Sequence, residues 1–283
     1  MLTLTSAAQV TNVSKEAHRA GKRVGFVPTM GALHEGHLSL VRAARNKSDV
    51  VAVSIFVNPT QFGPNEDFVQ YPRNLKRDSE MLERERADVI FAPSVDDMYP
   101  AGGITWVTVE GMSDRLCGKS RPGHFRGVTT VVAKLFHIIE PDAAFFGQKD
   151  AAQVAIIRRM VRDLNMPVSI EVCPIIRESD GLALSSRNAY LDPQERKSSL
   201  TLYRSLQDAQ KLFDRGERNS EKLIAAGKRK LATEPRARLD YFEIVDPDSL
   251  EPVTMISNRA LIAVAAFIGN TRLIDNIFVD HQR

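Results

Sequence analysis

The sequence predicts an α/β fold, a doubly wound parallel sheet followed by a smaller α+β domain. Two observations carry this prediction. Short apolar runs alternate with helical patterns up to about Val172, and one run, residues 49–57, is apolar almost throughout. Such a run is typical of a parallel strand that is buried on both faces. From about Ile176 the order changes to helices followed by strands, which indicates a separate unit.

The individual elements follow from the same patterns. In the first part we expect strands at residues 24–27 (ended by Pro28), 49–57, 89–91, 143–146 and 168–172, and helices at 74–87, 127–139 and 151–164. In the second part we expect helices at 193–216 and 220–233 and strands near 240–245 and 260–266. The expected domains are therefore 1–176 and 177–283. The ligand crevice of a doubly wound sheet lies at the carboxyl ends of its strands.

Composition excludes several classes of protein. The chain has 283 residues, 43% of them hydrophobic, and a net charge of +3, which argues against disorder and gives no support for nucleic-acid binding. Cys117 and Cys173 have no spacing typical of a disulfide framework or a metal site. No apolar run approaches the roughly 18 residues that span a bilayer, and no signal peptide is evident. We therefore expect a cytoplasmic protein that binds neither nucleic acid nor membrane.

The segment PTMGALHEGH follows the first expected strand and opens a helix. His34 and His37 are three residues apart and share one face of the first helical turn. Gly36 lacks a side chain, so a base or phosphate could approach the backbone, and free N–H groups at the helix start would suit a polyphosphate. The alternative is a capped helix with two surface histidines. His-x-Gly-His after the first strand resembles the signature of nucleotidyltransferase-like folds, which favours ATP.

Two further clusters are expected near the same crevice. Lys149 and Asp150, in GQKD, follow the strand at 143–146; the lysine can hold phosphates and the aspartate can accept from ribose hydroxyls. Ser185, Ser186 and Arg187 resemble the phosphate loop of adenylating enzymes, in which arginine stabilises departing pyrophosphate. An ordinary loop in the first case and a solvated turn in the second remain open alternatives.

Three residues are candidates for binding a small acid. Gln61 and Gln153 each follow a strand and carry amides, which can donate to and accept from a substrate with hydroxyls beside a carboxylate. Either glutamine could equally be structural. Arg121 lies in the cationic loop RPGHFRG, which either closes over an anion or only caps the following helix.

Taken together, these residues resemble the pantothenate synthetase (pantoate–β-alanine ligase) family over nearly the whole chain. The matching segments are VPTMGALHEGH from Val27, SIFVNP from Ser54 with Gln61 and Phe62, YPR from Tyr71, RPGHF from Arg121, Lys149-Asp150 with Gln153, DGLALSSRN from Asp180 and TRLIDN from Thr271. Three departures are visible: Gln148 stands where many relatives have Glu, Ala151-Ala152 replaces a bulkier pair, and Thr60 often reads Met.

The resemblance implies a Rossmann-like, HxGH-type domain that binds ATP and pantoate, a C-terminal lid, and usually a homodimer. The reaction it implies condenses pantoate with β-alanine through a pantoyl-adenylate and releases AMP and pyrophosphate. His37 matches the family's proton donor; we expect His34, Lys149 and Arg187 to act with it. The implied ATP contacts are Met30, Gly31, Ala32, Leu33, His34, Glu35, Gly36, His37, Gly147, Gln148, Lys149, Asp150, Ile176, Leu184, Ser185, Ser186 and Arg187.

The remaining expectations concern the acid, the metal and the rivals. Gln61 and Gln153 match pantoate-binding glutamines, Arg121 is expected to join them, and Gln61 also borders the β-alanine position. No cluster of protein metal ligands is evident, so Mg²⁺ is expected to be held mainly by the ATP phosphates. One rival is a nucleotidyltransferase that keeps the nucleotide on its product. Another is a nucleotide-sensing or RNA-binding module without turnover, which the mild charge disfavours.

Overall fold

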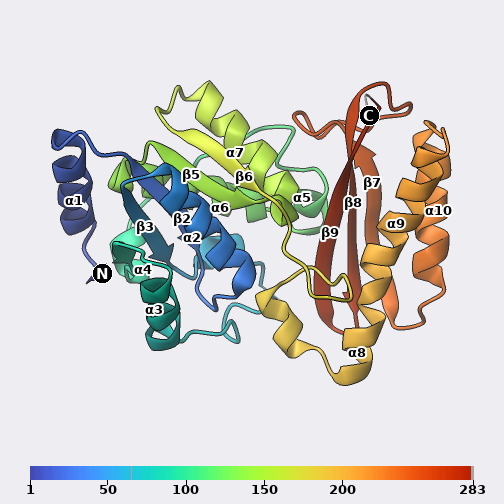
Figure 1. The fold of residues 1–283 in the computed structure, drawn as a ribbon, viewed down its shortest axis with the longest axis horizontal. Coiled ribbons are helices and arrows are strands. Elements are labelled where there is room, and N and C mark those ends of the chain that lie inside the picture. Colours follow the sequence, from blue (N-terminus) through green and yellow to red (C-terminus); the bar gives the residue numbers. More distant parts are fainter. Residues whose placement is uncertain (65, 282–283) are drawn as a thin grey trace.

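The computed structural model of the chain describes residues 1–64 and 66–281. Within them lie a six-stranded parallel sheet and a three-stranded antiparallel sheet, seen side by side in Figure 1. The predicted fold class is confirmed. The strands of the first sheet are β1 (Leu2–Leu4), β2 (Val24–Thr29), β3 (Val50–Ile55), β4 (Val89–Phe91), β5 (Ala143–Gly147) and β6 (Ser169–Cys173).

The first sheet is doubly wound, with strand order β1-β4-β3-β2-β5-β6. Alternate residues of each central strand enter different cores: Phe26 and Ala144 pack on one face, Val27 and Phe145 on the other. This explains why the strands read as continuous apolar runs. The helices around this sheet are α1 (Ala7–Arg19), α2 (Glu35–Lys47), α3 (Leu75–Arg84), α4 (Val95–Met98), α5 (Cys117–Ser120), α6 (His124–Ile139) and α7 (Ala151–Asp163).

The second sheet contains β7 (Ala237–Val245), β8 (Arg259–Ile268) and β9 (Thr271–Asp280). Ile262 and Val264 of β8 pack into one core with α9 (Leu200–Asp214) and α10 (Ser220–Ala232), which cover the outer face in Figure 1. Leu261 and Ala263, which alternate with them, join the core of the first sheet. The second sheet is therefore fastened to the first by one of its two faces.

Several predicted boundaries were wrong. Strand β2 does not end before Pro28 but continues to Thr29. A proline is tolerated there because β5 pairs only with Gly25 and Phe26, so one side of β2 is already free of ladder bonds at Pro28. Helix α6 begins at His124 rather than at residue 127, after Gly123 with φ of 82°.

The helix expected at 193–216 is two helices, α8 (Pro193–Ser198) and α9, separated at Ser199. The Ser199 hydroxyl donates to the Arg196 carbonyl at 2.7 Å at this junction. The sequence reading also missed β1, α1 and β9, which lie at the two ends of the chain.

Candidate active site

The crevice lies where the strand order reverses. β2 and β5 are neighbours, yet α2 follows β2 onto one face of the sheet while α7 follows β5 onto the other. Their carboxyl ends therefore open a gap between two loops, which is the usual ligand site of this architecture. The loop after β2 carries the HxGH motif, and the loop after β5 is the 3₁₀ turn η2 (Gln148–Asp150).

The loop between β2 and α2 is held by a buried carboxylate that the sequence reading did not single out. Asp78, which is 1% exposed on α3, accepts from the backbone N–H of Ala32 at 2.9 Å and of Leu33 at 3.0 Å. Gly31 and Ala32 adopt positive φ angles of 79° and 50° there. Asp78 thus fixes a strained turn and, with it, the start of α2.

His34 and His37 form the N-terminal cap of α2. Nδ1 of His34 accepts from the Gly36 N–H at 3.2 Å, and Nδ1 of His37 accepts from the His34 N–H at 3.4 Å. Because both Nδ1 atoms are acceptors, a neutral ring carries its proton on Nε2. The rings are 4.1 Å apart between centroids. The site therefore presents two adjacent Nε2–H donors.

Both histidines are held neutral. Burial, then the charge of Lys149, lowers the pKa of His34 to about 4. Burial, then His34 and Lys149, lowers the pKa of His37 well below its ordinary value. At neutral pH the pair therefore donates hydrogen bonds without carrying charge, and Lys149 lies close enough to influence both rings.

Two expectations for this motif need correction. The N–H groups of Gly36 and His37 are not free for phosphate, because His34 accepts both, with its ring and its carbonyl. Gly36 is also explained differently: a Cβ there would lie 2.9 Å from the His34 ring. The glycine makes room for the capping imidazole. The structure thus shows a capped helix, and the cap sets the tautomer that leaves Nε2–H as the donor of each ring.

The loop after β5 is attached to the second sheet. The Asn276 amide on β9 donates to the carbonyls of Gln148 at 3.0 Å and Lys149 at 2.9 Å, and accepts from the Gln148 side chain at 3.3 Å. Lys149 Nζ lies 3.7 Å from the Asp150 carboxylate. A Cβ at Gly147 would meet nothing within 4 Å, so the backbone there is open to close approach by a ligand.

The 184–187 segment lies against the first sheet's crevice. Leu184 bonds through its N–H to the Ile176 carbonyl at 3.0 Å, and its Cβ lies 3.8 Å from where a Gly36 Cβ would be. The Ser186 hydroxyl lies 3.1 Å from the Tyr71 hydroxyl, and the Arg187 guanidinium binds the Asp67 carboxylate at 2.8 and 2.9 Å. Tyr71 and Asp67 were not predicted.

Gln61 lies on the 3₁₀ turn η1 (Pro59–Gln61), and its amide is oriented by neighbours. Its Oε1 accepts from Asn58 at 3.1 Å, and its Nε2 lies 3.0 Å from the Met30 sulfur. Asn58 is itself buried and held by Tyr99 at 2.8 Å. The carbonyl oxygen of the amide is thus already used, and the Nε2 side faces Met30.

Arg121 is more constrained than the sequence suggested. Its guanidinium binds both oxygens of Glu66 at 2.6 Å and contacts His124 at 3.0 Å and the Gln61 carbonyl at 3.3 Å. His124 Nδ1 donates to the same carbonyl at 2.8 Å, and burial, then Arg121, lowers its pKa to about 4. This network supports the backbone of Gln61.

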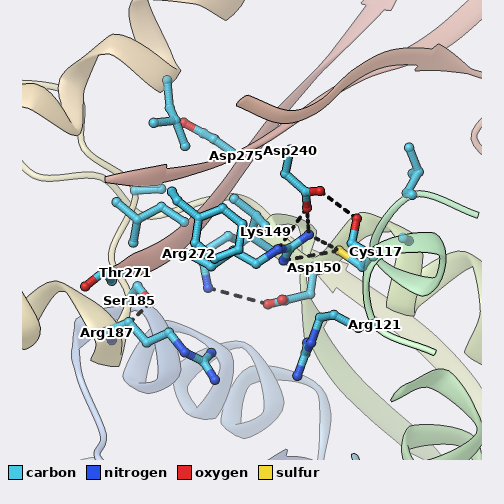
Figure 2. A pocket seen from close by; sticks show the side chains of 18 of the residues that line it. Cys117, Arg121, Lys149, Asp150, Ser185, Arg187, Asp240, Thr271, Arg272 and Asp275 are labelled. Atoms are coloured by element: carbon cyan, nitrogen blue, oxygen red, sulfur yellow. Dashed lines mark hydrogen bonds and ion pairs between the residues drawn. The ribbon is translucent and has the colours of Figure 1, made fainter. Parts of the chain in front are cut away.

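A cavity of about 1440 Å³ lies between the two sheets. Its lining includes six of the predicted residues, several of which are shown in Figure 2: Arg121, Lys149, Asp150, Gln153, Ser185 and Arg187. Among the predicted residues that do not line it are Met30, His34, His37 and Gln61. The Gln61 carbonyl contacts Arg121, which lines the cavity, and Met30 contacts Gln61. Lys149, which also lines it, is close enough to both histidines to lower their pKa values. Glu35 is exposed and pairs with Arg42, and the Leu33 side chain is in the core.

The profile of the pantoate-beta-alanine ligase family matches residues 2–278. The chain belongs to this family. Among curated relatives, the pantothenate synthetases of Koribacter versatilis and Moorella thermoacetica are 58% and 54% identical to it, each over 98% of this chain and over 95% and 98% of their own length. As a pantoate–β-alanine ligase the chain is an enzyme, and ATP is one of its substrates.

Solved structures agree with this assignment. The pantothenate synthetase of Thermus thermophilus superposes with a TM-score of 0.93 at 45% identity, covering 98% of this chain and 99% of that one. The ligase of Francisella tularensis, solved with β,γ-ATP and β-alanine, superposes with a TM-score of 0.79 at 37% identity, covering 98% and 97%.

Residues 1–64 and 66–281 contain neither a membrane-spanning helix nor a cluster of metal ligands. None of their helices is both long and apolar enough to cross a bilayer. No group of three or more His, Cys, Asp or Glu side chains within residues 1–64 and 66–281 is arranged to hold a metal ion.

Proposed function

We propose that the ligation proceeds through a pantoyl-adenylate formed in the crevice between β2 and β5. In this proposal the loop after β2, the turn η2 after β5 and the 184–187 segment supply the residues that act on ATP. The observation that carries this proposal is the meeting of Lys149, two neutral histidines and the Leu184–Arg187 segment at the switch point of the sheet. This meeting supports the binding of the α-phosphate among these groups.

In the first step, the pantoate carboxylate attacks the α-phosphorus of ATP and pyrophosphate leaves. The Nε2–H groups of His34 and His37 donate to the α-phosphate oxygens, and His37 is the proton carrier. Lys149, Ser185, Ser186 and Arg187 bind the departing pyrophosphate. There is little covalent work for the enzyme, so positioning and electrostatics provide the acceleration.

The acid and the amine occupy the side of the crevice next to η1. Gln61 offers its Nε2–H donors beside Met30, and Gln153 lines the cavity on the first turn of α7. Both suit a hydroxy acid. Arg121 attracts the carboxylate from the cavity wall. In the second step the neutral β-alanine amine, bordered by Gln61, attacks the acyl carbon, and the bond from that carbon to the AMP oxygen breaks. The proton that the amine loses passes through His37 to the departing AMP phosphate.

We propose Mg²⁺ as the metal that accompanies ATP, held mainly by the phosphates. The donor set of the cavity fits such an ion, because Asp150 and Asp67 place carboxylate oxygens beside the phosphate-binding cations, and Mg²⁺ prefers oxygen ligands and retains several waters. When bound, the ion would neutralise charge on the phosphates as pyrophosphate forms.

Product analysis tests the mechanism. With pantoate, β-alanine and ATP, the expected products are AMP and pyrophosphate in equal amounts. ADP and phosphate would contradict an adenylate intermediate. A product that retains the nucleotide would instead support the rival nucleotidyltransferase reading.

The same proposal covers the division into domains, the oligomeric state and the location of the protein. A division at residues 176 and 177 separates a nucleotide-binding domain from a C-terminal lid, which is supported by two sheets that share no strand. A homodimer is supported by the largely exposed residues 103–109, where Ile104 is 88% and Trp106 is 43% exposed; light scattering would give about twice the 31.5 kDa chain mass. A cytoplasmic location is supported by two free cysteines.

A further inference from the structure

Four cations that line the cavity each pair with a carboxylate that also lines it. Figure 2 shows the four cations, with Asp150 and Asp240 beside two of them. Any polyphosphate entering the cavity must compete with those carboxylates for the cations. The pairs are Lys149 with Asp150 at 3.7 Å, Arg121 with Glu66 at 2.6 Å, Arg187 with Asp67 at 2.8 Å and Arg272 with Asp240 at 2.7 Å.

Two of the arginine pairs are built into the fold. Arg121 also contacts the Gln61 carbonyl and His124, so its position is fixed by several partners. Arg272 also contacts the Cys117 sulfur, at 3.8 and 3.9 Å, and the Asp240 that binds it accepts from Ser120 at 2.7 Å. Exchanging either counter-ion would disturb a wider network.

Arg187 differs from both. Among the residues that the structure describes, Asp67 is the only hydrogen-bond partner of its guanidinium. Nε donates to one carboxylate oxygen at 2.9 Å and Nη2 to the other at 2.8 Å. This is the parallel, two-bond geometry by which a guanidinium binds two oxygens of a phosphate.

The pair also joins two separate parts of the chain. Asp67 lies in the segment between η1 and α3, whereas Arg187 lies on η3 (Ser186–Tyr190), and 120 positions separate them. The two side chains are 20% and 27% exposed, so the pair is accessible from the cavity and a competing anion can reach it.

We propose that the Asp67 carboxylate is a resident counter-ion that occupies, on Arg187, the position of the ATP phosphate oxygens. ATP displaces Asp67 when it binds, and Asp67 returns to Arg187 as pyrophosphate leaves. The exchange rests on the proposed phosphate-binding role of Arg187. It makes Asp67 a residue that weakens ATP binding and assists release of pyrophosphate.

Asp67→Asn is the direct test, because it keeps the shape of the side chain and removes its charge. Adenylation is followed by pyrophosphate exchange, with pyrophosphate inhibition measured alongside. We expect the KM for ATP and the inhibition constant for pyrophosphate to fall about twofold to fivefold, the scale of one partly exposed ion pair. Asp67→Ser is the second variant should the asparagine disturb folding, which circular dichroism reports.

Two controls separate exchange from other effects. Glu243→Gln removes the same charge from another carboxylate that lines the cavity and should change the KM for ATP less than twofold. In an Arg187→Ala background, Asp67→Asn should have no further effect on that KM. An equal fall in the Glu243 variant, or an undiminished fall without Arg187, would show general charge repulsion and overturn the exchange.

The direction in which the KM for ATP changes distinguishes failure of the counter-ion role of Asp67 from failure of the phosphate-binding role of Arg187. If Arg187→Ala raises the KM for ATP and Asp67→Asn raises it as well, Asp67 positions Arg187 for phosphate and the counter-ion role is wrong, while the proposed function stands. If Arg187→Ala leaves that KM unchanged, Arg187 does not bind the phosphates, and both its proposed role and the exchange are contradicted.

Discussion

At the scale of single residues, the same two histidines form the cap of α2 and supply the proposed hydrogen-bond donors of the site. The Nδ1 atoms of His34 and His37 are acceptors in the cap, which leaves Nε2–H as the donor of each ring. Burial beside Lys149 then keeps the pair neutral. A positively charged imidazole would bind phosphate more tightly, but the lysine already supplies charge at this position. In the proposed mechanism the histidines supply hydrogen-bond donors with a fixed direction.

His34→Asn separates the cap from the donor, because asparagine is a good N-cap but cannot supply the imidazole Nε2–H. The variant should fold and melt like the wild type, yet its adenylation rate should fall by roughly 10²-fold, the scale for loss of one preorganised donor. His137→Ala, at an exposed histidine of α6, is the control and should keep the full rate. A loss below about threefold in the His34 variant would show that the imidazole serves only as a cap.

The lowered pKa values also predict how stability depends on pH. Both His34 and His124 have a folded pKa of about 4, below the ordinary value of 6.5. Between these values the unfolded chain binds protons that the folded chain does not, so the free energy of unfolding falls as pH is lowered from 6.5 towards 4. Denaturant unfolding across this range should show a shallower decline in His124→Asn, with parallel curves above about pH 7. Identical declines would contradict a neutral, buried His124.

The residues that sequence reasoning found and missed differ in how far away their partners are. The cap formed by His34 and His37 uses neighbours within three positions, so a capped helix could be predicted from the spacing of the motif. Asp78 holds a loop 46 positions away, and Asn276 holds one 128 positions away. No local pattern distinguishes such an aspartate or asparagine from a surface residue.

At the scale of elements, the position of Gln61 depends on how closely α6 approaches η1. A Cβ at Gly127 would lie 2.3 Å from the Thr60 carbonyl oxygen and 2.7 Å from the Gln61 nitrogen. The Gly127 carbonyl also accepts from Asn58 at 3.1 Å, and Asn58 in turn orients the Gln61 amide. Only a glycine allows this helix to support the turn.

Gly127→Ala should therefore displace η1, because the clash is with backbone atoms that cannot rotate away. We expect about 1–3 kcal/mol lower stability, the usual cost of overpacking, and a KM for pantoate raised about tenfold or more, since small misplacements of a binding group are costly. The comparison is Gly147→Ala, where a Cβ meets nothing within 4 Å and stability should not change. An unchanged KM for pantoate in Gly127→Ala would show that Gln61 does not bind the acid.

Strand and helix types were predictable from the sequence in the elements with the strongest apolar patterns, such as β3 and α7. The boundaries were not. β2 runs through Pro28 because of where its neighbour β5 stops pairing. This boundary depends on a contact that the periodicity of a single segment does not contain.

At the scale of the whole molecule, the second sheet is more than a cover. Its β9 carries Asn276, whose amide binds the carbonyls of Gln148 and Lys149. The adjacent Asp275 is fixed by Arg177 at 2.6 and 2.8 Å. Lys149 is thus positioned from the second sheet, so the placement of that sheet and that of the turn η2 are coupled.

Asn276→Ala should raise the KM for ATP and slow adenylation by roughly tenfold, since two donated bonds to the Lys149 loop are lost. Asn276→Asp should be at least as impaired, because it keeps the shape but sets a carboxylate against two carbonyl oxygens. Asn258→Ala, at an exposed asparagine of the same domain, is the matched control. Wild-type kinetics in the Asp variant would show that the amide does not position Lys149.

The central claim is an adenylate formed in the crevice between β2 and β5 before the amine takes part. Its most direct test is exchange of labelled pyrophosphate into ATP with pantoate present and β-alanine absent. The account predicts exchange that requires pantoate and falls by roughly 10²-fold in His34→Asn. Exchange that is absent until β-alanine is added, from an enzyme that still makes product, would contradict it.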